Sequence, residues 1–355
     1  MLNQRRWQRI ILLIVLAYEG LGCLVGGALL IARPDGRYMQ MPVGIMHGTF
    51  RDFLIPGVIL SGLGILTVAA FFAVLRKSRW DWLWAGLSMG GLAVWFLVEI
   101  VILRELHWLH VMWGFPVLLG GGMALPLLPF RFETRRDTWL VCGVASSLLY
   151  AAMNIIVPVE WTAYDPVSQT VSELSAVGAP TRPLWVVLGV LYTVLVTVFG
   201  WGVRMAAGGD RRLRIAGNLI AVYGALGIVW VFAPMHAREV LAAGGGSFKD
   251  TLHLVLGGVT EVLYLVALGF AASALGTAFR LYSIATFVSV LLFGAVMFQQ
   301  APHVGRNEPT PLLGVWERIN IGLFMLWVIV LAIVLLVRGH AKDRHEPLHA
   351  LPQPA

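Results

Sequence analysis

The stretch 191–226, LYTVLVTVFGWGVRMAAGGDRRLRIAGNLIAVYGAL, consists of two apolar segments separated by a short connection that is rich in arginine. Apolar segments of about twenty residues are long enough to cross a bilayer as α-helices. Arginine and lysine concentrate in the short connections that remain on the cytoplasmic side of a membrane. The stretch therefore predicts two membrane-spanning helices joined by a cytoplasmic turn.

The composition of the whole chain points the same way. Of its 355 residues, 58% are hydrophobic and 13% are charged, and the mean hydropathy is +0.79. Soluble domains carry about 25% charged residues, so a water-soluble globular protein is excluded. The formal net charge of +7 does not indicate a nucleic-acid partner, because the basic residues lie in short clusters between apolar segments. We predict an all-α, polytopic integral membrane protein whose partner is the lipid bilayer.

The order of apolar segments and basic connections predicts the topology. Ten candidate spans cover about 10–32, 53–75, 81–103, 108–130, 138–158, 184–206, 215–234, 251–273, 281–300 and 319–337. Basic residues precede the first span and follow the second, fourth, sixth, eighth and tenth. An odd number of spans would break this alternation. The positive-inside rule therefore predicts a multi-pass protein of the cell membrane with both termini in the cytoplasm.

The connection at 131–138 divides the predicted spans into four and six. We accordingly predict a four-helix membrane module at 1–136 and a six-helix membrane domain at 137–338. The remaining segment, 339–355, is polar and contains prolines, which is typical of a disordered tail.

Small residues and cysteines within the spans predict packing rather than chemistry. Gly86 and Gly90 have the GxxxG spacing, and glycines also cluster at 120–122. Small residues let helix backbones approach closely in lipid, so we expect helix contacts there. The two cysteines, Cys23 and Cys142, give neither a disulfide framework nor a zinc-binding spacing. No cofactor is predicted.

Several polar motifs of the second half carry a family resemblance. They are SQTVSELSAVGAPTRPLW (168–185), PMHAREV (234–240) with DTLHLVLGGVT (250–260), FRLYS (279–283) and GVWERINIG (314–322). On these motifs, about 138–338 resembles DUF998, a family of prokaryotic integral membrane proteins. The resemblance implies a six-helix domain with polar motifs on its outer side, and it implies no established activity. The first half looks like a separate four-helix membrane module.

Three predicted outer segments of the second half supply unusual polar residues. They contribute Ser168, Ser172 and Glu173, then His236, Arg238, Asp250 and His253, then His303, Glu317 and Arg318. These segments are distant in sequence but share one predicted face of the membrane. We therefore predict a polar pocket on that face, which binds or processes a small or lipid-like ligand.

The catalytic candidates are His253, Asp250 and Glu173. Asp250 and His253 are three residues apart at the start of a predicted helix, so their side chains share a helix face. His253 could act as a general base or a metal ligand that Asp250 orients. In the alternative interpretation, Asp250 only caps the helix and His253 is a hydrogen-bonded residue of the membrane interface.

The ligand-binding candidates include two serines and two ionic residues. If a short helix carries Ser168 and Ser172, the two hydroxyls point the same way and could bind a polar headgroup. Alternatively, they satisfy backbone groups of a re-entrant loop. Glu173 could pair with Arg238 or Arg318. Glu317 and Arg318 are predicted to form a structural ion pair at the start of the last span.

Acidic residues inside predicted spans are a third group of candidates. A charge near mid-bilayer costs on the order of 2.5–3.5 kcal/mol, so such residues usually face a partner or a cavity. Glu261 lies about two turns beyond His253 and could continue a polar path into the bundle. Glu19 and Glu99 could do the same in the first half. Packing of protonated or hydrogen-bonded carboxylates is the alternative.

Three further functions compete with simple ligand binding. A metal-dependent, lipid-directed hydrolase would gather His236, His253, His303 and Asp250 around zinc, but the HxxxH spacing is absent and no metal is predicted. A proton-coupled transporter or permease would place Glu99 and Glu261 on a water path. A non-catalytic membrane scaffold would pair its polar groups with one another.

Overall fold

The computed structural model describes residues 2–46, 50–103, 108–127 and 134–345. Within these residues the structure is helical, and ten helices are long and apolar enough to cross a membrane. The predicted all-α, multi-pass bundle is therefore confirmed. The chain divides into two compact units, Met1–Pro129 (unit 1) and Phe130–Ala355 (unit 2).

Unit 1 is built from four long helices. They are α1 (Leu2–Ala32), α2 (Leu54–Leu75), α3 (Asp81–Leu103) and α4 (Trp108–Ala124), with 3-10 turns at η1 (Arg37–Met39), η2 (Val43–Met46) and η3 (Leu125–Leu127). Helix α1 packs against α2 and α4, and α3 packs against the same two helices. The core includes Leu12, Leu16 and Leu92, all fully buried. Unit 1 is thus a bundle closed around apolar side chains.

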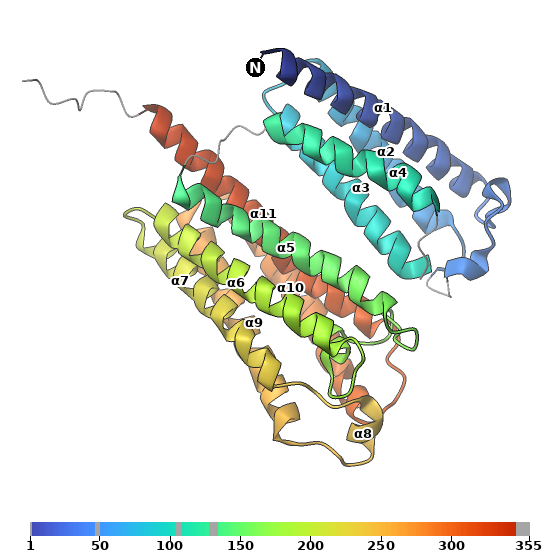
Figure 1. Ribbon diagram of the computed structural model, residues 1–355, viewed down its shortest axis with the longest axis vertical. Helices are drawn as coiled ribbons and strands as arrows, with labels where there is room; N and C mark the ends of the chain where they lie inside the picture. Colours follow the sequence, from blue (N-terminus) through green and yellow to red (C-terminus); the bar gives the residue numbers. More distant parts are fainter. Residues whose placement is uncertain (1, 47–49, 104–107, 128–133, 346–355) are drawn as a thin grey trace, which may run out of the picture. The chain divides into compact units, whose positions relative to one another are not determined.

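Unit 2 contains six long helices and several short elements. They are α5 (Arg135–Val159), η4 (Val171–Ser175), α6 (Arg182–Ala206), α7 (Arg211–Leu226), η5 (Gly227–Phe232), α8 (Arg238–Ala242), α9 (Phe248–Ala274), α10 (Thr277–Gly305) and α11 (Leu313–His345). Each long helix packs against the next, and α11 packs against α5, so the six helices form a closed ring. Figure 1 shows α8 and the long connections gathered at one end of this bundle.

Glycines allow the closest helix contact of unit 2, between α6 and α7. A Cβ atom on Gly217 would lie 2.6 Å from the backbone nitrogen of Arg204, and one on Gly200 would lie 2.3 Å from that of Ala221. The predicted GxxxG contact at Gly86 is wrong, because no described atom lies within 4 Å of a Cβ placed there. Spacing alone does not determine which glycines face a neighbouring helix.

Two helix ends differ from the predicted boundaries. Helix α10 continues through Pro302 to Gly305, so His303 lies in its last turn rather than in a loop. Helix α11 continues to His345, and the first part of the predicted disordered tail is therefore helical. Residues 346–355 lie outside the described residues.

Candidate functional site

Three connections of unit 2 interlock at the same end of the bundle, which we name the outer cap: residues 160–181, 233–247 and 306–312. The backbone N–H of Val177 donates to Met235 O at 2.8 Å, which joins the first connection to the second. The Thr310 hydroxyl donates to Ser168 O at 2.8 Å, which joins the third to the first. Segments more than a hundred residues apart in sequence thus form one polar layer.

A buried ion pair lies at the centre of the outer cap. Arg238 Nε donates to Glu173 Oε1 at 2.6 Å, and Arg238 Nη2 donates to Oε2 at 2.8 Å. Arg238 Nη1 donates to the Thr310 hydroxyl at 2.7 Å, so the guanidinium also holds the third connection. Glu173 is 3% exposed and Arg238 is 8% exposed. Of the two predicted partners of Glu173, the structure pairs it with Arg238 and not with Arg318.

The Glu173 carboxylate is saturated with donors. Besides Arg238, it accepts from Thr170 N at 2.6 Å, the Thr170 hydroxyl at 2.9 Å and Gln169 Nε2 at 3.1 Å. Burial would raise the pKa of Glu173, but the hydrogen bonds and charge of Arg238, helped by Thr170 and Gln169, hold that pKa below its ordinary value. A carboxylate has about four acceptor positions, so none remains for a substrate proton. The contacts of Glu173 make it an anchor of the cap.

Ser172 and His253 form a hydrogen-bonded pair beside this anchor. His253 Nδ1 lies 2.8 Å from Ala233 O, and His253 Nε2 lies 3.0 Å from the Ser172 hydroxyl. A carbonyl oxygen only accepts, so Nδ1 carries the proton, and in a neutral ring Nε2 accepts the hydroxyl proton of Ser172. His253 is buried and makes a T-shaped ring contact with Trp230, whereas Ser172 is partly exposed. The serine is therefore the accessible member of the pair.

Asp250 orients a different histidine from the one expected. Its carboxylate accepts from His236 N at 2.7 Å, from His236 Nδ1 at 2.8 Å and from Ser247 N at 2.8 Å. Ser247 and Asp250 form a capping box at the start of α9, so the carboxylate turns toward the helix terminus. Among the described residues the hydrogen bonds of Asp250 go to His236 and Ser247, and these contacts match the capping alternative.

Ser168 is separated from Ser172 by its local structure. It lies in a turn before η4, and its hydroxyl donates to Asp165 Oδ2 at 2.7 Å. The two serines therefore do not share a helix, and the expected pair of parallel hydroxyls is not formed.

Glu317 and Arg318 bind separate parts of the outer cap. Glu317 accepts a hydrogen bond from the backbone N–H of Val171. Arg318 Nη2 donates to the Tyr164 hydroxyl at 2.7 Å, and Nη1 donates to Pro166 O at 2.9 Å. The expected ion pair between Glu317 and Arg318 is absent from the salt bridges of the described residues, because each side chain holds a different stretch of the first connection.

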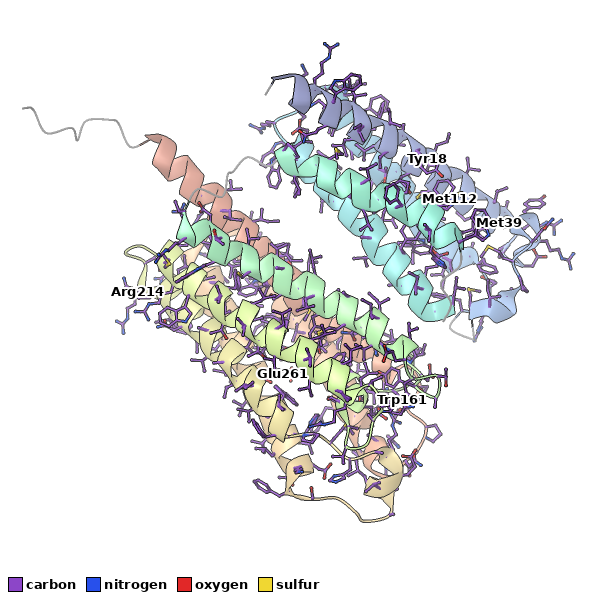
Figure 2. All side chains as sticks on the ribbon, viewed as in Figure 1. Tyr18, Met39, Met112, Trp161, Arg214 and Glu261 are labelled. Atoms are coloured by element: carbon purple, nitrogen blue, oxygen red, sulfur yellow. The ribbon has the colours of Figure 1, made fainter. Side chains whose placement is uncertain are left out.

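The acidic residues of the spans have surroundings of their own within each unit. Glu261 lies near the middle of α9 (Figure 2), beside Gly294 of α10 and Asn320 of α11. In unit 1, Glu19 is fully buried, and neither of its carboxylate oxygens has a hydrogen-bond partner among the described residues. Each carboxylate thus lies at its own position in its bundle.

The three histidines of the zinc hypothesis have separate partners. His236 contacts Asp250, His253 contacts Ser172, and His303 contacts Glu308. Across the part of the chain that the structure describes, no group of three or more His, Cys, Asp or Glu residues is arranged to hold a metal ion.

Sequence reasoning named Ser172 and His253 but did not pair them, since 81 residues separate the two. One signal was readable in the sequence: Thr170 and Glu173 have capping-box spacing, and the structure forms that capping box at η4. Ala233 and Thr310 carried no signal, because a backbone carbonyl and a loop threonine acquire a role only through the fold.

Comparison with known proteins supports the motif-based resemblance. No curated protein and no solved structure matches the chain. The family described as "Protein of unknown function (DUF998)" matches residues 144–334, which is more than half of the chain and lies within unit 2. The protein therefore belongs to the DUF998 family.

Proposed function

We propose that unit 2 cleaves an ester bond of a lipid-like ligand at its outer cap, with Ser172 as the nucleophile and His253 as the general base. The observation that carries this proposal is the 3.0 Å contact between the Ser172 hydroxyl and His253 Nε2. In serine hydrolases the nucleophile is typically hydrogen-bonded to a base, and a third group orients that base. Here the third group is the carbonyl of Ala233, which fixes the tautomer of the ring.

The proposed reaction conserves protons at these two residues. Ser172 Oγ attacks the ester carbonyl carbon while its proton passes to His253 Nε2. The protonated ring then gives that proton to the departing alcohol oxygen, which leaves an acyl group on Ser172. Water hydrolyses the acyl-serine in a second step, again with His253 as the base, and a carboxylic acid is released.

The position of His253 along α9 suits an ester of a membrane lipid. His253 is the sixth residue of α9, about 8 Å along the axis from the first residue, Phe248. The polar headgroup region of a bilayer extends over a similar depth, between water and the hydrocarbon core. The nearby anchor of Glu173 and Arg238 holds η4, which carries Ser172, in a fixed conformation.

Covalent labelling with a fluorophosphonate tests the proposal on the purified full-length chain. We expect the probe to modify Ser172 of the wild type, as read by peptide mass spectrometry. Ser172→Ala should abolish the modification. His253→Gln should slow it by at least about 100-fold, the lower end of what a positioned base contributes. Ser168→Ala is the matched control and should react like the wild type, because that hydroxyl contacts Asp165 instead of a histidine.

The opposite result would favour a non-catalytic cap. A specific observation supports that second candidate, since the Glu173 carboxylate is fully occupied by protein donors. If the wild type and Ser172→Ala are equally unreactive while both remain folded, the hydrolase proposal fails. The Ser172–His253 contact would then be one more bond that holds the outer cap together.

A further inference from the structure

A groove opens in unit 2 at the end opposite the outer cap. Its volume is about 500 Å³, and it lies between α9 and α10 with Arg212 of α7 at its edge. Figure 2 labels Trp161 and Arg214 at opposite ends of this unit, and Arg214 lies in the first turn of α7 together with Arg212. The sequence predicts this end to be cytoplasmic.

Small residues form the floor of the groove and apolar side chains form its wall. Gly269, Ala272 and Ser273 of α9 supply the floor, and Ile284 and Phe287 of α10 supply the wall. A second hollow of about 330 Å³ adjoins the groove at Gly269 and Ser273 and extends to Val266 and Phe270 of α9. The surface along this part of α9 is therefore shaped to receive a flexible apolar chain.

Two arginines border the same groove, and each has N–H donors that the protein does not use. Arg212 Nη1 donates to Ser273 O at 2.9 Å, and Arg280 Nε donates to Ala272 O at 3.4 Å. A guanidinium has five N–H donors, so each arginine keeps several for a ligand. Neither forms a salt bridge with any acidic residue that the structure describes. Arg338 lies nearby, with Nη2 at 3.7 Å from the position of a Cβ on Gly276.

We infer that this groove is a binding site for an anionic phospholipid, with the phosphodiester on Arg212 and Arg280 and an acyl chain along Gly269. The charge of the rim and the apolar floor match the two ends of such a lipid. Guanidinium groups bind phosphate oxygens in a bidentate manner, and basic pockets between helices on the cytoplasmic side bind anionic headgroups. The inference is independent of the chemistry proposed for Ser172.

Gly269 offers a way to fill the groove without disturbing the helices. No described atom lies within 4 Å of a Cβ placed on Gly269, so a larger side chain would project into the groove. Gly258, on the same helix, is also exposed and is equally free of neighbours. Gly269→Leu therefore blocks the site, and Gly258→Leu is its matched control.

Native mass spectrometry of the full-length chain tests the site, with phosphatidylglycerol and phosphatidylcholine offered together in detergent micelles. We expect the wild type to retain phosphatidylglycerol at least about tenfold better than phosphatidylcholine. The double variant Arg212→Gln/Arg280→Gln should lose most of this preference, and Gly269→Leu should lose binding of the lipid. Arg211→Gln and Gly258→Leu should behave like the wild type.

Three results would overturn the inference. The first is equal retention of both lipids by the wild type, and the second is undiminished retention of phosphatidylglycerol by Gly269→Leu. The third is full competition by inorganic phosphate, which should compete only weakly because it has no acyl chain to occupy the groove. A thermal unfolding scan of each variant confirms that a loss of lipid does not reflect a loss of fold.

Discussion

At the scale of single residues, the Glu173–Arg238 pair has the strongest energetic consequences. Both side chains are buried, and the carboxylate and guanidinium satisfy one another through two hydrogen bonds. Removing one partner of a buried pair leaves an uncompensated charge, which costs about 3–5 kcal/mol. Exposed pairs contribute only about 0–1 kcal/mol, because water screens them.

We therefore predict that Arg238→Gln lowers the free energy of unfolding by about 3–5 kcal/mol, measured by thermal or denaturant unfolding in detergent. Arg306 and Glu308 provide the matched control, since their side chains are 60% and 42% exposed at a separation of 3.2 Å. Arg306→Gln should cost less than about 1 kcal/mol. Equal effects of the two substitutions would contradict the assignment of Glu173 and Arg238 as an anchor.

The same pair should give the cap a dependence on pH. The pKa of Glu173 is held below its ordinary value of 4.5 in the folded chain, so the unfolded chain binds the proton more readily. The stabilisation is therefore complete above about pH 4.5 and is lost as the pH falls through the folded pKa. The difference in melting temperature between wild type and Glu173→Gln should shrink accordingly between pH 6 and the most acidic pH that the detergent tolerates.

At the scale of helices, glycines of the same type have opposite roles in unit 2. Gly217 faces the backbone of α6, whereas Gly258 is exposed and has open space around it. An added methyl group at Gly217 must push two helix backbones apart. At Gly258 it meets nothing and only improves the helix propensity.

Two alanine substitutions should consequently change stability in opposite directions. We expect Gly217→Ala to destabilise unit 2 by about 1–3 kcal/mol, the usual range for overpacking. Gly258→Ala should stabilise it by about 0.4–1 kcal/mol. Apparent melting temperatures of the two variants, compared with the wild type, measure both effects. An unchanged or raised melting temperature of Gly217→Ala would show that the α6–α7 contact is looser than the structure describes.

At the scale of the whole molecule, the basic connections predict the orientation in the membrane. Ten candidate spans with arginine-rich turns at every second connection predict that the outer cap faces away from the cytoplasm. In a Cys23→Ala/Cys142→Ala background, a cysteine at Lys249 should react with an impermeant maleimide in intact cells. A cysteine at Arg211 should react only after permeabilisation. The reverse pattern would invert the topology and move the lipid groove to the outer leaflet.

How much could be predicted from the sequence differs between the fold and the site. Apolar length and charge order are local properties, and they predicted the helical membrane bundle and its ten spans. The polar motifs of the second half carried the resemblance to the family that the comparison then matched. The exact ends of helices were harder, because α10 continues through Pro302 where a loop was expected. A proline near the last turn of a long helix does not by itself end it.

The sequence by itself determined that this chain is a multi-pass helical protein. Lipid offers no hydrogen-bond partners, so the backbone N–H and C=O groups of each apolar segment must bond to one another within a helix. Only the tertiary structure decided the partners: Ser172 with His253, Glu173 with Arg238, and Asp250 with His236. Such pairs depend on how loops between distant helices meet at one end of the bundle. No local sequence pattern encodes the distances between residues of different loops. Which residues pair at the site was therefore decided by the fold.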